Sequence, residues 1–219
     1  METQFKRFFE IFLEALHRIQ PHYFETVYKS MDAIDVALGP YRHERRAVSS
    51  ISRNGERIFC YELYHHLRIL IDIEREQNYG FLPGAFLQAE VYKLQVLDLI
   101  ERFGLEQLSR NFIPDFLVHT PGNADLHAFV VEVKVNRRLS VHSLSEDLNK
   151  LQEFITRYKY KRGIFLSVLT EWDYLTDLIG RAMDEHLIWD PLVAATSIFI
   201  INKESVTAPA TFRTLKEFI

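Results

Sequence analysis

Two charges interrupt an otherwise apolar run in the middle of the chain. Residues 126–135 read Leu-His-Ala-Phe-Val-Val-Glu-Val-Lys-Val, and after His127 the polar positions are Glu132 and Lys134. A carboxylate or an ammonium that is buried while ionised and unpaired is strongly destabilising. We therefore expect these two side chains to pair with each other, to bind a metal ion, or both.

The charged run belongs to a predicted β-hairpin. Residues 111–119 and 126–135 have the composition of strands, and the turn-forming segment 120–125 joins them. The first strand contains Asp115, which follows Pro114 and is again surrounded by apolar residues. The hairpin thus carries a second buried acid.

The register of this hairpin decides whether the charges meet. Alternate side chains of a strand share a face, so Glu132 and Lys134 project together. Asp115 falls opposite either Val131 or Glu132, and only the second register places both acids on one face. Two adjacent carboxylates repel each other, and a divalent cation removes that conflict. Oxygen ligands favour Mg²⁺ over zinc, with Mn²⁺ as the alternative.

The rest of the pattern predicts the α/β class, with a mixed central β-sheet flanked by helices. Helices are expected at residues 5–19, 23–38, 55–77, 96–103, 143–160 and 171–187, and further strands at 85–92, 163–169 and 193–202. Polar residues 42–53 are expected to form a linker or an exposed loop. A capping-box sequence at residues 143–146 is expected to start the helix that follows it.

Composition limits the protein classes to consider. A chain of 219 residues with 47% hydrophobic content fits one domain. The net charge of -4 argues against binding polyanions through overall charge, so any contact with nucleic acid needs a local patch. A single cysteine, Cys60, excludes an internal disulfide and a cysteine-based zinc site. The first residues lack a signal-peptide or membrane pattern, so we expect a cytoplasmic protein without membrane contact.

The spacing of the charged residues resembles a known signature. Pro114-Asp115, followed after sixteen residues by Glu132-Val133-Lys134, is similar to the motif of the PD-(D/E)XK nuclease superfamily, which has the restriction-endonuclease-like fold. The resemblance covers roughly residues 54–202 and implies a core in which a helix precedes a strand meander, which is followed by a helix and a strand. It divides the chain into an N-terminal helical extension at 1–40, packed on the core, and a nuclease-like domain at 54–219.

The resemblance also implies a function. It implies a Mg²⁺-dependent nuclease that hydrolyses phosphodiester bonds, with DNA as the favoured substrate, in restriction, repair or phage defence. Asp115 and Glu132 would bind the metal, with the Val133 carbonyl as a further ligand, and Lys134 would position or activate the attacking water. The superfamily often adds an acid from the helix before the sheet, and Glu62 fits that role. The alternative for Glu62 is an ordinary i,i+4 partner on the helix surface.

Other charged residues are candidates for the same site or its surroundings. Glu90 on the first strand is a second candidate acid, which could equally face solvent. Basic residues interleaved with tyrosines at 157–162 have the composition that holds nucleic acid, although cations at a helix C-terminus also complement its dipole. The candidates for nucleic-acid contact are Lys150, Lys159, Lys161 and Arg162.

The same residues are compatible with two other functions. In one, the protein is a catalytically inactive member of the same fold, the charges form an ion-paired core, and the chain acts as an interaction subunit. In the other, it binds nucleic acid without cleavage, for which salt-sensitive and metal-independent binding is expected. Whether cutting both strands requires a homodimer is also open.

Overall fold

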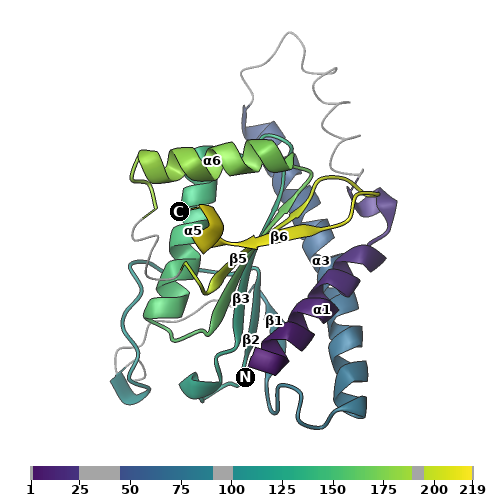
Figure 1. Cartoon of the computed structure of the whole chain (residues 1–219), viewed down its shortest axis with the longest axis vertical. Coiled ribbons are helices and arrows are strands. Elements are labelled where there is room, and N and C mark those ends of the chain that lie inside the picture. Colours follow the sequence, from purple (N-terminus) through teal and green to yellow (C-terminus); the bar gives the residue numbers. More distant parts are fainter. Residues whose placement is uncertain (1, 25–44, 91–100, 189–194, 219) are drawn as a thin grey trace.

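The computed structural model describes residues 2–24, 45–90, 101–188 and 195–218. In these residues the chain forms one six-stranded mixed sheet with helices packed against it (Figure 1). The strands are β1 (Phe86–Ala89), β2 (Phe116–His119), β3 (Phe129–Val135), β4 (Arg162–Val168), β5 (Ile198–Lys203) and β6 (Thr211–Thr214). The helices are α1 (Glu2–Arg18), α3 (Arg45–Gln77), α5 (Val141–Thr156) and α6 (Trp172–Asp184), with 3-10 turns η1 (Ala124–Leu126) and η2 (Leu215–Phe218).

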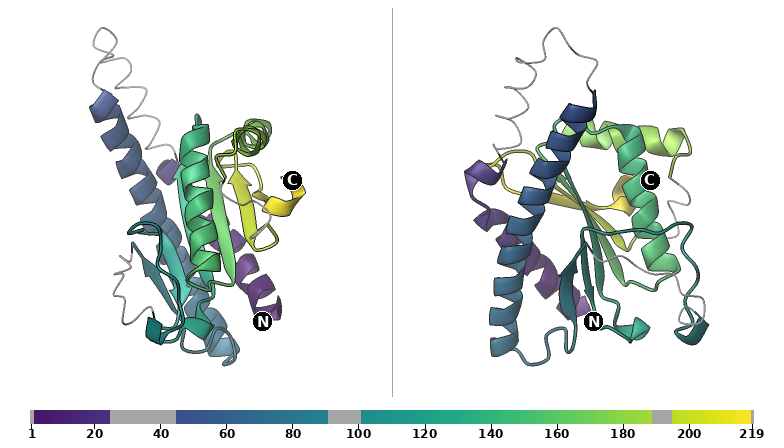
Figure 2. Two further views of the ribbon diagram at one scale, coloured as in Figure 1. Left: turned by 90° about the vertical axis from the view of Figure 1, so that its left-hand side faces the viewer. Right: turned by 180° about the vertical axis from the view of Figure 1, so that it is seen from behind.

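The strands lie in the sheet in the order in which they follow one another in the chain. Strands β1, β2 and β3 form an antiparallel meander, β3, β4 and β5 are parallel, and β6 is antiparallel to β5. Parallel neighbours require a crossover, which α5 supplies between β3 and β4 and α6 between β4 and β5. Helices α5 and α6 contact each other on one face of the sheet, while α1 and α3 pack together against the other (Figure 2).

Helices on both faces explain why the central strands carry apolar residues on both of their faces. Alternate residues of β3, starting at Phe129, pack into the cluster shared with α1 and α3, whereas Val130 packs into the cluster shared with α5 and α6. The side chains of Glu132 and Lys134 alternate with the first set and therefore project toward α5. The expected mixed sheet flanked by helices is confirmed.

Helix α1 is part of this core. Phe8 is fully buried, and its ring stacks on that of Phe129 with centroids 4.0 Å apart. The expected helix at residues 5–19 is therefore present, and its apolar face covers one side of the sheet. Most of the second expected helix, at 23–38, lies outside the described residues, and the division of the chain into an extension at 1–40 and a domain at 54–219 stays a prediction.

Several expected boundaries were wrong. Residues 45–53 are helical rather than a linker, because α3 begins at Arg45; that segment contains neither proline nor glycine, and its serines are tolerated in a helix. The cap of α5 is Ser140, whose hydroxyl accepts a hydrogen bond from the Ser143 amide, so the expected capping box starts three residues too late. Helix α5 also ends at Thr156, not near residue 160.

The hairpin strands are shorter than expected, and one strand was missed. Strand β2 begins only at Phe116, because Pro114, two residues earlier, has no backbone N–H to donate to a β-ladder. Strand β6 lacks an apolar alternation strong enough to be recognised. The expected helix at 96–103 and the start of the expected strand at 193–202 fall largely outside the described residues. None of the helices in the described parts of the chain has the length and apolar character needed to cross a membrane.

Candidate active site

The site begins where β2 stops pairing with β3. The ladder between these strands ends at the Phe116–Val131 pair. Beyond it, two alternate amides of β3 donate to carboxylates instead of a strand: Val133 to Asp115 Oδ2 at 2.7 Å and Val135 to Glu56 Oε2 at 3.3 Å. Buried amides need acceptors, so the divergence of β2 from β3 fixes two acids along the free edge of β3.

The register is the one that the site requires. Continuing the ladder by one residue beyond Phe116 and Val131 sets Asp115 opposite Glu132. Glu132 is only 1% exposed, and its Oε2 lies 2.5 Å from Lys150 Nζ on α5. Its Oε1 is buried and has no hydrogen-bond partner among the described residues. An orphaned carboxylate oxygen in the interior is costly and marks a position where a cation or a donor is needed.

Lys134 connects the acids of α3 with those of α5. Its Nζ lies 3.5 Å from Glu56 Oε1 and 3.2 Å from Asp147 Oδ2. Asp147 Oδ1 in turn lies 3.4 Å from Lys150 Nζ. We call the whole set the charge cluster: Glu56, Asp115, Glu132, Lys134, Asp147 and Lys150. It contains four carboxylates and two ammonium groups, so it carries two excess negative charges when every member is ionised.

Burial makes this excess charge unfavourable. It raises the pKa of Asp115 to about 6, an effect that the nearby Lys134 partly opposes. It also raises the pKa of Glu132 well above its usual value, against the attraction of Lys150, and raises that of Glu56. Burial alone would lower the pKa of Lys134, but the surrounding carboxylates outweigh it and raise the pKa. The two lysines therefore stay charged, while Asp115, Glu132 and Glu56 favour a proton or a nearby cation.

The donor chemistry of the cluster suits a hard cation. Carboxylate oxygens are the ligands that Mg²⁺ prefers, and Asp115 and Glu132 supply them from adjacent strands. The described residues nevertheless contain no group of three or more acidic, histidine or cysteine side chains already arranged around a metal position. One oxygen of the Glu132 carboxylate is paired with Lys150, and the other has no hydrogen-bond partner among the described residues.

The glutamate of α3 that lies in the charge cluster is Glu56, not the predicted Glu62. Glu62 lies 3.2 Å from His66 in an i,i+4 pair, the alternative that its sequence context left open, and it is outside the charge cluster. Six residues turn a helix by roughly 240°, so the two glutamates face different directions. A signal for Glu56 was present: it stands three residues before the buried Phe59 and extends the apolar stripe of α3 toward the N-terminus.

The remaining candidates lie apart from the cluster, except for Lys150. Glu90 pairs with Arg57 in an exposed ion pair at 3.0 Å. Strand pairing places Arg162 beside Phe129, five residues along β3 from Lys134 and so roughly 16 Å away. Lys161 precedes Arg162 directly and lies at the same end of the sheet. Lys159, whose backbone φ of 58° lies in the left-handed region, is two residues before Lys161. The basic run at 157–162 and the charge cluster are therefore separate features.

Comparisons with protein-family models, with curated proteins and with solved structures found no match to this chain. The class that the structure defines is a mixed α/β protein with a buried charge cluster at the point where β2 and β3 diverge.

Proposed function

We propose that this protein is a Mg²⁺-dependent nuclease of the restriction-endonuclease-like fold, which hydrolyses phosphodiester bonds with DNA as the favoured substrate. The observation that carries the proposal is that Asp115 and Glu132 meet Lys134 in a buried cluster with more carboxylates than ammonium groups. The element order α3, β1, β2, β3, α5, β4 supports the fold assignment. A setting in restriction, repair or phage defence, a cytoplasmic location and a homodimer are parts of the same proposal.

Each residue has a role that its contacts support. Asp115 and Glu132 would hold the metal, with the Val133 carbonyl as a further ligand, and Glu56 takes the place proposed for Glu62. A bound Mg²⁺ supplies charge for a phosphoryl oxygen and lowers the pKa of a bound water. Lys134 is held between carboxylates of α3 and α5, and from that position it would orient or activate the attacking water.

Lys150 is the candidate phosphate contact within the cluster. Its ammonium lies between the carboxylates of Glu132 and Asp147, so the side chain is already held at the cluster. Neutralising Glu132 by a cation would leave the charge of Lys150 available for an anion. The other proposed nucleic-acid contacts, Lys159, Lys161 and Arg162, lie at the far end of β3 and would touch a different part of a long substrate.

The test is cleavage of plasmid DNA and of a matched RNA with Mg²⁺ and with EDTA. We expect Mg²⁺-dependent cleavage that falls by at least about 100-fold in Glu132→Gln and Lys134→Met, the range for loss of a group acting on the reacting centre. Glu56→Gln should lose activity, while Glu62→Gln on the same helix serves as the matched control and should retain it. Equal activity in the wild-type protein and Glu132→Gln would refute the nuclease.

One observation favours a second function. Glu132 is almost completely buried, and the carboxylates of Glu56, Glu132 and Asp147 already have lysine partners. Such an arrangement also suits a catalytically inactive protein whose cluster is a structural core and whose surface binds a partner. Calorimetric titration with Mg²⁺ and Mn²⁺ separates the two: binding that disappears in Asp115→Asn supports the enzyme, and absence of binding supports the inactive protein.

A further inference from the structure

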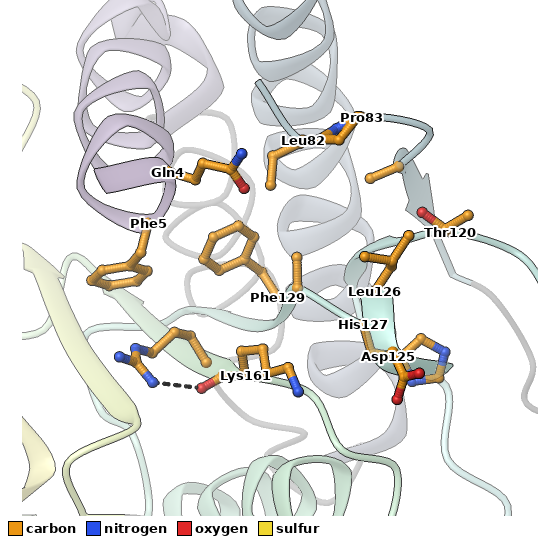
Figure 3. A pocket seen from close by; sticks show the side chains of 13 residues that line it. Gln4, Phe5, Leu82, Pro83, Thr120, Asp125, Leu126, His127, Phe129 and Lys161 are labelled. Carbon is orange, nitrogen blue, oxygen red and sulfur yellow. Dashed lines mark hydrogen bonds between the residues drawn. The ribbon is translucent and has the colours of Figure 1, made fainter. Parts of the chain in front are cut away.

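A pocket of about 200 Å³ lies at the end of β3 that is remote from the charge cluster (Figure 3). It opens between the start of α1, the loop that follows α3 and the first residue of β3. Its apolar lining includes Phe5, Leu82, Leu126 and Phe129. An apolar cavity of roughly 150 Å³ accommodates benzene, so this pocket has room for a substituted aromatic ring.

The walls of the pocket are fixed by contacts outside it. The ring of Phe129 is held by stacking on Phe8, with centroids 4.0 Å apart. His127 Nδ1 donates to the Tyr158 carbonyl at 2.7 Å. Leu82 is buried although its φ of 44° lies in the left-handed region that such residues rarely adopt, so the loop is constrained to place it there. A preformed pocket loses little entropy when a ligand enters.

Lys161 and Thr120 contribute polar groups to this pocket. Lys161 is one of the lining residues, and its ammonium forms no ion pair or hydrogen bond with the described residues, while its amide donates to the His127 carbonyl at 3.2 Å and so holds the residue in place. Thr120 Oγ1 is buried and also has no hydrogen-bond partner within the described parts of the chain. A buried hydroxyl without a partner is costly, and a ligand that satisfies Thr120 removes that cost.

The charge of the lining favours an anion. Lys161 and Arg162 are both part of it, and among the described residues that line the pocket Asp125 alone is acidic. The Arg162 guanidinium lies 5.3 Å from the centroid of Phe5 and donates to the Lys161 carbonyl at 2.9 Å. The Arg162 side chain thus packs against the pocket wall, and we assign Lys161 as the cation that contacts the ligand.

We propose that this pocket binds a small aromatic carboxylate, with its ring against Phe129 and Leu126 and its carboxylate at Lys161. The volume sets the size of the ring, and the unpaired ammonium sets the charge of the substituent. This site is distinct from the charge cluster, and the proposal does not depend on nuclease activity.

The experiment compares three probes of one size and different charge: benzoate, benzyl alcohol and benzylamine. Each is titrated into the full chain and followed by amide chemical shifts and calorimetry. We expect saturable binding of benzoate, with shifts at Leu126 and Phe129, binding of benzyl alcohol that is about tenfold weaker, and no saturation with benzylamine. Loss of one charge-assisted hydrogen bond corresponds to about tenfold or more in affinity.

The variants locate the binding energy. Lys161→Met should weaken benzoate about tenfold while leaving benzyl alcohol unchanged, and Lys216→Met, at an exposed lysine on η2, should bind benzoate like the wild-type protein. Thermal unfolding checks that both variants are folded. The proposal is overturned if benzoate does not saturate, if benzylamine binds as tightly as benzoate, or if Lys161→Met binds benzoate unchanged. Equal binding of benzyl alcohol and benzoate would overturn it too, because the site would then take a neutral apolar ligand.

Discussion

Replacing Lys150 with methionine removes one of the two ammonium groups of the charge cluster and keeps most of the apolar stem. Glu132, which is 1% exposed, loses its contact at 2.5 Å, and Asp147 loses one at 3.4 Å. Breaking a buried ion pair from one side costs about 3–5 kcal/mol, because the remaining charge is left uncompensated. The Lys150 side chain is 14% exposed, so we expect a loss of about 3 kcal/mol in the free energy of unfolding.

This loss of stability is caused by the Glu132 carboxylate, which is left buried without a partner. Two further expectations follow from that cause. Adding Glu132→Gln to Lys150→Met removes the unpaired charge and should restore most of the stability. Without Lys150 the pKa of Glu132, which burial already raises, increases further. The folded protein then binds a proton more readily than the unfolded chain, so the destabilisation is largest at high pH and shrinks as the pH falls through the folded-state pKa.

The assay is urea unfolding at about pH 8 and about pH 5, which measures the free energy of unfolding. It compares the wild-type protein, both single variants and the double variant. The cycle isolates the coupling between Lys150 and Glu132. If the nuclease proposal is also right, millimolar Mg²⁺ should stabilise Lys150→Met more than the wild-type protein. A loss below about 1 kcal/mol at the higher pH, the size typical of surface pairs, or a double variant no more stable than Lys150→Met, would show that the reasoning is wrong.

Three further predictions concern single residues. Burial raises the pKa of Asp115 from 3.8 to about 6, so the folded protein loses stability as the pH rises through that interval. In metal-free denaturation curves, Asp115→Asn should therefore be more stable than the wild-type protein at about pH 8, by at most about 3 kcal/mol, and similar to it near pH 4. Phe8→Ala should cost about 3–5 kcal/mol in the same assay because its ring is buried against Phe129, and an effect below about 1 kcal/mol would remove α1 from the cooperative core. Ser140→Ala should lower the free energy of unfolding by about 1 kcal/mol, and a larger effect of Ser143→Ala would place the cap of α5 elsewhere.

Much of the fold was predictable because its signals are local. The apolar periodicity of α1 and α6, the continuous apolar run of β4 and the turn between β2 and β3 can each be recognised within a short window of sequence. The mixed sheet flanked by helices follows from the order of these elements. Boundaries were less accurate, because the start of α3 and the cap of α5 depend on single side chains and on what lies beside them.

The candidate site likewise contains residues with a local sequence signal and a residue that only its contacts in space reveal. Asp115, Glu132 and Lys134 were identified because charges within apolar strands stand out in the sequence. Glu56 was missed because, apart from its place on the apolar stripe of α3, a core-facing glutamate has the same local appearance as one on the helix surface. Its role follows only from its contacts with Lys134 and the Val135 amide, 78 and 79 residues further along the chain.

The residue pattern of β3 already requires an acid and a lysine to have partners in the interior, because isolated buried charges are too unfavourable to persist. The identity of those partners follows from the packing of distant segments. The packing of α3 and α5 against β3, and the divergence of β2 from it, bring carboxylates from distant segments to one edge. Electrostatic interactions depend on distance in space and not on separation along the chain, so these choices could not be read from local pattern.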